Sequence, residues 1–171
     1  MRLIFLSTLL VAALIALDHR SSLQAWASGS ARGVGSLQGA PAPELPGLRA
    51  LRGRVVVVHF WTFGCSNCRH MLPRYAEWLD RYGGRGLSVI GVHTPEMDYE
   101  RDPAALARFV RDEKIRWPVV VDPDEAIWQR YRVAAWPTIV LVDRAGVVRA
   151  TFVGDDRSSE IEDRIREIIS H

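Results

Sequence analysis

Runs of apolar residues and helix-like apolar stripes alternate along the chain from Leu48 onward. A β-branched run at residues 54–60 and an apolar run at residues 87–92 have the composition of buried strands. Between them, residues 66–82 carry apolar side chains at three- and four-residue spacing, which predicts an amphipathic helix. Pro73 lies inside this helix and should kink it, because proline removes one backbone donor and crowds the preceding turn.

The same alternation continues to the C-terminus. Residues 143–146 have the length and composition of a hairpin turn. Ser159 and Glu162 form the signature of a capping box, and Asp122 and Asp124 are expected to order a turn and cap a short helix. The elements expected here are a helix at 103–114, a strand at 119–121, a short helix at 124–131, strands at 138–142 and 147–153, and a helix at 159–169.

This order of elements predicts an α/β sandwich with a mixed sheet. The early strands should be parallel, because each is followed by a crossover helix, whereas the strand at 138–142 starts a hairpin and runs the other way. The carboxyl ends of parallel strands meet at one edge of the sheet, where ligands bind. We expect that edge to bring together Cys65, His93, Thr94, Glu96 and the Trp136-Pro137 pair.

Composition divides the chain into three regions. Residues 1–27 have the pattern of a signal peptide or N-terminal anchor, with Arg2 before a long apolar run and Ala25-Trp26-Ala27 as a cleavage pattern. Residues 28–47 are rich in Ser, Gly, Ala and Pro and are expected to be a flexible tether, followed by one domain at 48–171. The domain is therefore expected to be exported, to the periplasm or another extracytoplasmic space, either free or tethered to the membrane.

The charge of the chain argues against a nucleic-acid partner. Its 171 residues include 22 Lys or Arg and 20 Asp or Glu, which gives a formal net charge of +2. The basic residues are scattered, so nothing resembles a phosphate-binding stripe. A hydrophobic content of 48% is ample for a core, and we expect a monomer.

The only two cysteines, Cys65 and Cys68, stand at the start of the predicted helix. A sulfur at a helix N-terminus feels unpaired N–H groups and the positive end of the helix dipole, which favour thiolate over thiol. The second sulfur, about one turn further on, can attack a mixed disulfide formed by the first. A bond across so short a loop constrains the unfolded chain little, so a purely structural disulfide is the weaker interpretation. The pair therefore predicts two-electron thiol–disulfide exchange.

Several motifs, taken together, resemble the thioredoxin superfamily. They are the Cys65-x-x-Cys68 turn, Pro73 after it, and the Pro137-Thr138 pair that opens the hairpin. The strand–helix–strand–helix stretch between the helix and the hairpin is similar to the exported TlpA-like and redoxin branch. The motifs most similar to the thioredoxin-like domain of DipZ-type proteins are Phe60-Trp61-Thr62, the Cys-x-Asn-Cys ending, Gly91-Val92-His93-Thr94-Pro95-Glu96, Ala126-Ile127-Trp128 and Trp136-Pro137.

The resemblance implies a thioredoxin-like three-layer sandwich, with helices on both sides of a central mixed β-sheet. It also implies that Cys65 is the nucleophile and Cys68 the resolving thiol, with no cofactor beyond their redox-active disulfide and no metal. Pro137 matches the family's cis-proline, next to which Trp136 would bind an extended substrate segment. The partners implied are protein thiols and disulfides, and a separate membrane thiol carrier that supplies electrons.

Three further residues are candidates for the site. His59 stands where thioredoxins often place a buried carboxylate, so it is either the base for Cys68 or a core histidine bound to a backbone carbonyl. His93 and Glu96 could line a substrate groove or cap a loop. His70, just past Cys68, is expected to face solvent.

Two other functions fit parts of the pattern. A peroxiredoxin-like thiol peroxidase would share Thr62-x-x-Cys65, but Val58 stands where the peroxidatic pattern has proline. A copper-binding chaperone of the Sco type could use both sulfurs with His59 or His93 to bind Cu(I), although such proteins space their cysteines one residue wider. Peroxide consumption and stoichiometric copper binding distinguish these functions from disulfide exchange.

Overall fold

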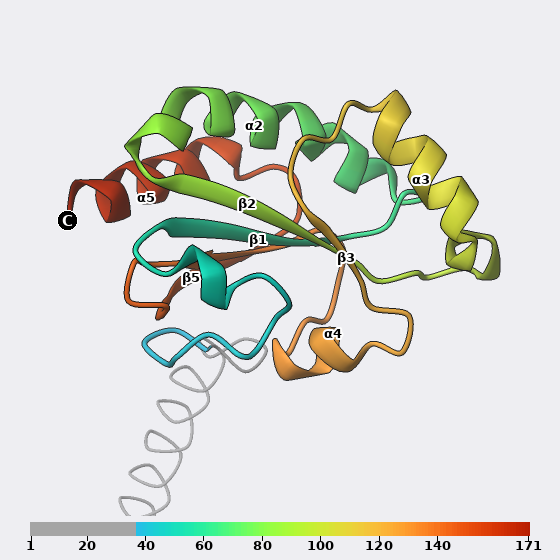
Figure 1. Cartoon of the computed structure of the whole chain (residues 1–171), viewed down its shortest axis with the longest axis horizontal. Coiled ribbons are helices and arrows are strands. Elements are labelled where there is room, and N and C mark those ends of the chain that lie inside the picture. The colour runs from blue at the N-terminus through green and yellow to red at the C-terminus, as the bar shows by residue number, and fades with distance from the viewer. Residues whose placement is uncertain (1–36) are drawn as a thin grey trace, which may run out of the picture. The chain divides into compact units, whose positions relative to one another are not determined.

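Strand β1 (Val55–Trp61) lies at the centre of a five-stranded sheet with the order β3-β2-β1-β4-β5 (Figure 1). The computed structural model describes residues 37–171. β1 pairs in parallel with β2 (Leu87–His93), which pairs in parallel with β3 (Val119–Val121). On its other side β1 pairs antiparallel with β4 (Thr138–Val142), which pairs antiparallel with β5 (Val148–Val153). The predicted mixed sheet is confirmed.

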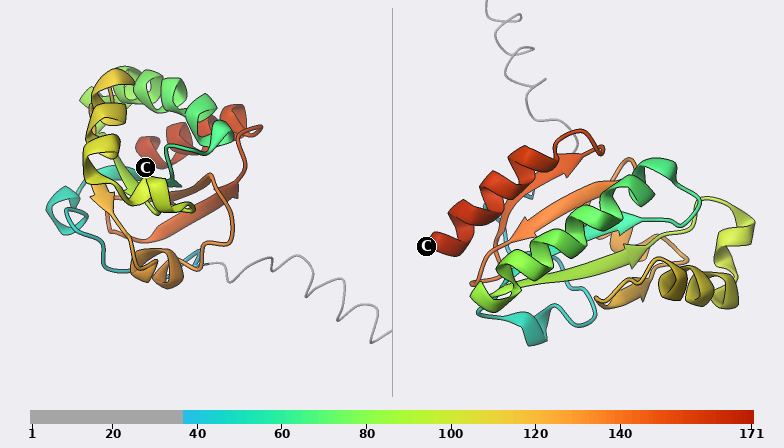
Figure 2. Two further views of the ribbon diagram at one scale, coloured as in Figure 1. Left: turned by 90° about the vertical axis from the view of Figure 1, so that its right-hand side faces the viewer. Right: turned by 90° about the horizontal axis from the view of Figure 1, so that it is seen from above.

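Helices cover both faces of this sheet. Helices α2 (Ser66–Tyr82) and α5 (Ser158–Ser170) lie side by side on one face, and α4 (Ala126–Arg130) lies on the other (Figures 1 and 2). The remaining helical elements are α3 (Pro103–Asp112), η1 (Arg49–Leu51), η2 (Gly83–Arg85) and η3 (Asp98–Arg101). The structure therefore has the three predicted layers, with the sheet between two layers of helices.

Alternation along β1 divides the core into two layers. All seven of its residues are buried. Val55 and Val57 pack with α2 and α5, whereas Val56 and Val58 pack with the α4 layer. Because successive strand side chains point to opposite faces, His59 belongs with the α2 layer. The pattern explains why this strand is a continuous apolar run.

Residues 37–47, which the sequence assigns to a tether, are packed onto the sheet. The N–H of Gly39 donates to the carbonyl of Val148 and that of Ala42 to the carbonyl of Gly146. The side chain of Leu45 is 3% exposed, within the core layer on the α4 side. The packed unit therefore begins ahead of the boundary expected at residue 48. The expected leader at 1–27 and residues 28–36 of the tether lie outside the described residues.

The described part of the chain, residues 37–171, has no helix long and apolar enough to span a membrane.

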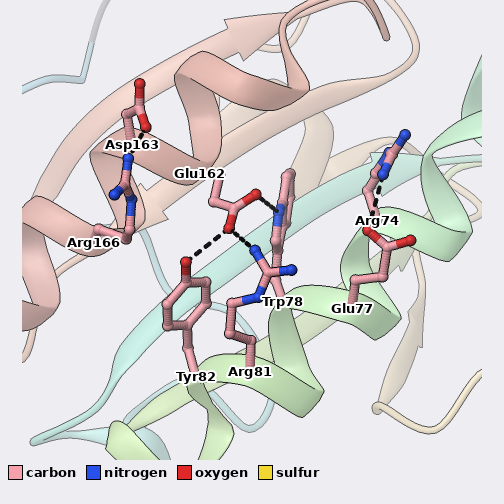
Figure 3. A network of polar contacts seen from close by, with 8 residues as sticks. All are labelled: Arg74, Glu77, Trp78, Arg81, Tyr82, Glu162, Asp163 and Arg166. Carbon is pink, nitrogen blue, oxygen red and sulfur yellow. Dashed lines mark hydrogen bonds and ion pairs between the residues drawn. The ribbon is translucent and has the colours of Figure 1, made fainter.

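The capping box predicted at the start of the last helix does not form. Helix α5 begins at Ser158, its N-cap is Arg157, and no side chain caps it. Glu162 instead turns toward α2 and accepts hydrogen bonds from Tyr82 Oη at 2.7 Å and Trp78 Nε1 at 3.3 Å (Figure 3). A buried phenol and a buried indole need an acceptor that water cannot supply, and this need outweighs the local cap.

The Glu162 contacts predict a pH-dependent stability. Glu162→Gln removes the charge from hydrogen bonds that join the two helices, so we expect a loss of about 2 kcal/mol of unfolding free energy at neutral pH. The hydrogen bond from Tyr82, opposed by burial and aided by Arg81, holds the pKa of Glu162 below its usual value of 4.5. The contribution is therefore present above pH 4.5 and is lost as the pH falls through the lowered pKa. Denaturant unfolding at several pH values measures it.

Asp163→Asn is the matched control. Its carboxylate, one residue further along α5, pairs with the exposed Arg166 side chain (Figure 3). Exposed pairs of this kind contribute little, so stability should change by less than about 0.5 kcal/mol. An equal loss of unfolding free energy in both variants would show that the hydrogen bonds of Glu162 contribute no more to stability than an exposed ion pair does.

Candidate active site

The two cysteines lie where β1 has ended and α2 begins. Cys65 is the N-cap residue of α2, with extended backbone angles of φ −76° and ψ 113°. Its Sγ accepts a hydrogen bond from the N–H of Cys68 at 3.2 Å. The two residues form a disulfide, with their Cα atoms 5.3 Å apart. Cys65 thus occupies the helix position at which N–H groups and the dipole favour a sulfur anion.

The two sulfurs differ in their access to solvent. Cys65 is partly exposed, whereas Cys68 is 1% exposed and packs with Trp61 and Leu106. A bulky partner can therefore reach Cys65 but not Cys68. This asymmetry is what a nucleophile and an internal resolving thiol require.

The Trp136-Pro137 segment meets the same end of the sheet. The bond between the two residues is cis. The indole of Trp136 packs against the cluster that holds Cys68 and against Trp128, with ring centroids 4.3 Å apart. Within residues 37–171, the main-chain N–H and C=O of Trp136 make no backbone hydrogen bond.

His59 lies beneath α2 and is fully buried. Its ring stacks on Tyr75 at 4.2 Å, and its Nε2 lies 2.8 Å from Trp117 Nε1. Because an indole N–H can only donate, Nε2 accepts and the proton of the neutral ring is on Nδ1. Burial lowers the pKa of His59 to about 3. Gly91 lies opposite on β2, where an added Cβ would come within 2.9 Å of Nε2.

His93 ends β2 and is also fully buried. Its ring is stacked under Phe63 with centroids 5.5 Å apart, and its Nε2 lies 3.3 Å from Thr62 Oγ1. Burial, offset in part by the charge of Glu100, lowers the pKa of His93 to about 4. His93 therefore stands behind the cysteine turn, shielded from solvent by Phe63.

Glu100 is a residue of this site that no sequence motif identifies. It is 2% exposed, and its carboxylate accepts hydrogen bonds from the N–H groups of Gly64 at 2.8 Å, Glu96 at 2.6 Å and Met97 at 2.8 Å. Burial acts to raise its pKa, but these bonds and one from Thr62 outweigh burial, so the pKa lies below its ordinary value. In the sequence, Glu100 is one of several charges in a polar stretch before Pro103, and nothing there marks it as buried.

Two of the remaining candidates, Glu96 and His70, face outward, whereas Asp122 is buried. The side chain of Glu96 is exposed, and its main chain is held by Glu100. His70 is exposed, as expected, and its Nδ1 lies 3.2 Å from Asp155. The carboxylate of Asp122 accepts hydrogen bonds from the N–H groups of Ile127 at 2.9 Å and Trp128 at 2.8 Å, in the first turn of α4, whose N-cap residue is Glu125. No three His, Cys, Asp or Glu side chains in the described part of the chain are grouped so that they could hold a metal ion.

Comparison with known proteins places the chain in a family. The sequence profile of the AhpC/TSA family matches residues 44–151, more than half of the chain, and the chain belongs to this family. A solved structure of a thioredoxin-like superfamily protein superposes with a TM-score of 0.70 at 26% identity, covering 77% of this chain and 97% of the other. The thioredoxin-like fold implied by the motifs is confirmed.

Two curated relatives show different extents of similarity. Protein DipZ of Mycobacterium bovis is 33% identical over 139 residues, which cover 81% of this chain and 20% of DipZ. This chain thus spans about a fifth of the length of that relative. Thiol-disulfide oxidoreductase YkuV of Bacillus subtilis is 27% identical over 141 residues, which cover 76% of this chain and 95% of YkuV.

Burial of His59 predicts a loss of stability in mild acid. The unfolded chain binds a proton at the usual pKa of 6.5, whereas the folded chain resists it down to about pH 3. Stability from this residue is therefore complete above pH 6.5 and falls progressively below it. Between pH 7.5 and pH 5 the change is roughly 2 kcal/mol. His59→Gln should remove that part of the pH dependence in denaturant unfolding, and parallel curves for wild type and variant would contradict it.

Proposed function

We propose that this protein is an exported thiol–disulfide oxidoreductase that reduces disulfides in other proteins. The observation that supports it most is the asymmetry of the dithiol: a partly exposed sulfur at a helix N-cap, bonded to a buried one. The relative YkuV, which carries the name thiol-disulfide oxidoreductase and is matched over nearly its whole length, supports the same activity.

The proposed reaction begins with the reduced protein. The Cys65 thiolate attacks one sulfur of a substrate disulfide, the substrate S–S bond breaks, and the released substrate thiolate takes up a proton. The Cys68 thiol then loses its proton to solvent, its thiolate attacks Sγ of Cys65, and the mixed disulfide breaks. The second substrate sulfur leaves as a thiolate and takes up a proton. The electron pair lost by the dithiol is gained by the substrate, and the protein ends with the Cys65–Cys68 disulfide.

The segment at Trp136 and Pro137 would hold the substrate during these steps. The main-chain N–H and C=O of Trp136, which make no backbone hydrogen bond within residues 37–171, can pair with an extended polypeptide as an added strand does. Packing of its indole against Trp128 fixes the position of that main chain. Glu96, exposed on the neighbouring loop, is proposed to contact the same substrate segment, whereas the buried His93 would support the turn from behind.

The contacts of His59 favour a core role over proton transfer. Its Nε2 lone pair accepts the hydrogen bond from Trp117, and Nδ1 already carries the proton of the neutral ring. To accept a proton from Cys68, His59 would have to lose the hydrogen bond from Trp117 and carry a positive charge in the core. We therefore propose that His59 orders the layer beneath α2.

Reducing equivalents would come from a membrane thiol carrier on the exported side. The apolar run and cleavage pattern within residues 1–27 support export. The relative DipZ is about five times as long as the matched stretch, so most of DipZ lies outside the match with this chain. A search for a mixed disulfide between this protein and a membrane protein would identify the donor.

The contacts of the site favour the two alternative functions less than disulfide exchange. The Thr62 hydroxyl, which a peroxidase would use near its cysteine, is hydrogen-bonded to Glu100 and lies 3.3 Å from His93 Nε2. A Sco-type Cu(I) site would use a histidine beside the two sulfurs, and no third His, Cys, Asp or Glu is grouped with them within residues 37–171.

Single cysteine variants test the order of events. Cys68→Ser should accumulate a mixed disulfide through Cys65, because the resolving attack is missing, whereas Cys65→Ser should form none and should reduce insulin disulfides no faster than the double variant. Non-reducing gels and peptide mass spectrometry of the trapped bond provide the measurement. The double variant is the control for nonspecific adducts. Trapping through Cys68 would reverse the assignment, and trapping in neither variant would refute the proposed function.

A further inference from the structure

Glu100 is a buried carboxylate whose hydrogen-bond donors are all neutral. Its acceptor bonds come from the main chain of Gly64, Glu96 and Met97 and from the Thr62 hydroxyl. Burying a carboxylate costs several kcal/mol unless its oxygens are satisfied, and these four donors satisfy them. They do not cancel the negative charge, which therefore acts on its surroundings with little screening by solvent.

The carboxylate is attached to the turn that carries the nucleophile. Oε1 accepts from Gly64, the residue before Cys65, while Oε2 accepts from the loop that follows β2. One side chain thus joins the cysteine turn to the neighbouring loop. The geometry leaves no room beyond glycine at position 64, since an added Cβ there would collide with Glu100 Oε1 and the Tyr99 hydroxyl.

Other charged or titratable groups at this end lie on the packed elements. On the first turns of α2, Arg69 forms an ion pair with Glu113, and Nδ1 of His70 lies 3.2 Å from the Asp155 carboxylate. His93, at the end of β2, is kept neutral at pH 7 because burial lowers its pKa to about 4. Tyr99, on η3, is exposed and packs on Phe63. Unlike these groups, Glu100 places a negative charge with no cationic partner against the Cys65 turn.

We propose that Glu100 is a positioning residue of the dithiol, which fixes the Cys65 turn and, as a charge held behind it, raises the proton affinity of the Cys65 thiol. This inference rests on the proposed function. The N-cap position stabilises a Cys65 thiolate, and the nearby carboxylate opposes that stabilisation. A less stable thiolate disfavours the reduced protein, so the dithiol becomes a better electron donor. The charge thus favours the reducing direction proposed above.

Glu100→Gln tests the inference. An amide accepts at only one end, so Gln can keep the two bonds from the β2 loop but must place its NH₂ group against the N–H of Gly64. In the full chain with Cys68→Ser, where Cys65 is the only thiol, the pKa of Cys65 from thiolate absorbance should fall by about half a unit or more, a threefold gain in thiolate. With both cysteines present, the equilibrium with glutathione should shift about threefold toward the reduced protein.

Asp98→Asn is the matched control, because it replaces a carboxylate by an amide on the same η3 segment. The Asp98 side chain is fully exposed, and its pairing with Arg101 at 3.8 Å is a surface contact. Both readouts should match the wild type. Gly64→Ala is a second test that keeps the carboxylate: the added methyl group must displace Oε1 from the turn, and the Cys65 pKa should fall in the same direction.

The outcomes separate this inference from the proposed function. A lowered Cys65 pKa in Glu100→Gln, or in Gly64→Ala if the first variant does not fold, with an unchanged Asp98→Asn, supports it. A Cys65 pKa that is unchanged or raised overturns it, even when the wild-type protein exchanges disulfides normally. A wild-type protein that exchanges no disulfides would instead refute the proposed function.

Discussion

The burial of β1 on both faces is the constraint on which the site depends. All seven of its residues are inaccessible to solvent, and it pairs with a strand on each side. The strand therefore has one register in the sheet, and the chain that leaves it at Trp61 emerges at one edge. Helix α2 must start close by, because its apolar stripe packs back over the same strand. Cys65 falls at the N-cap as a consequence.

Two opposing electrostatic influences meet at that N-cap. The helix end and the N–H of Cys68, which donates to the Cys65 sulfur, favour a thiolate. The buried carboxylate of Glu100, held against Gly64, disfavours it. In our account the acidity of the nucleophile is a balance between these two terms, and this balance decides whether the dithiol gives or takes electrons. The start of α2 supplies the first term, and the loop after β2 supplies the second.

The elements of this fold follow from local patterns in the sequence. The α2 stripe and the short β3 run depend on periodicity within one segment, and both appear at the predicted residues. The shared edge of the parallel strands follows from topology. Contacts between distant segments do not follow from local patterns. Glu162 has the local signature of a cap, yet its partners lie on α2, some 80 residues away. Residues 37–47 have a tether-like composition and still pack on the sheet.

The candidate site divides in the same way. The dithiol and the Trp136-Pro137 segment carry motifs, so the sequence alone marks them as candidates. Glu100 carries none, because its importance comes from N–H groups on two different loops that meet only in the folded chain. The two roles left open for His59, base or core residue, depend on what surrounds its ring. Its hydrogen-bond donor, the indole of Trp117, is 58 residues away in the sequence, so local patterns could not decide between them.

Equilibration of the purified full chain in glutathione buffers of graded potential measures the central claim most directly. Alkylation and mass spectrometry report the fraction of Cys65 and Cys68 in each state. Our account predicts one two-electron transition, in which both sulfurs change together, at a potential reducing enough for the protein to transfer electrons to protein disulfides. A disulfide that stays closed across the whole range, or sulfurs that change state independently, would contradict it.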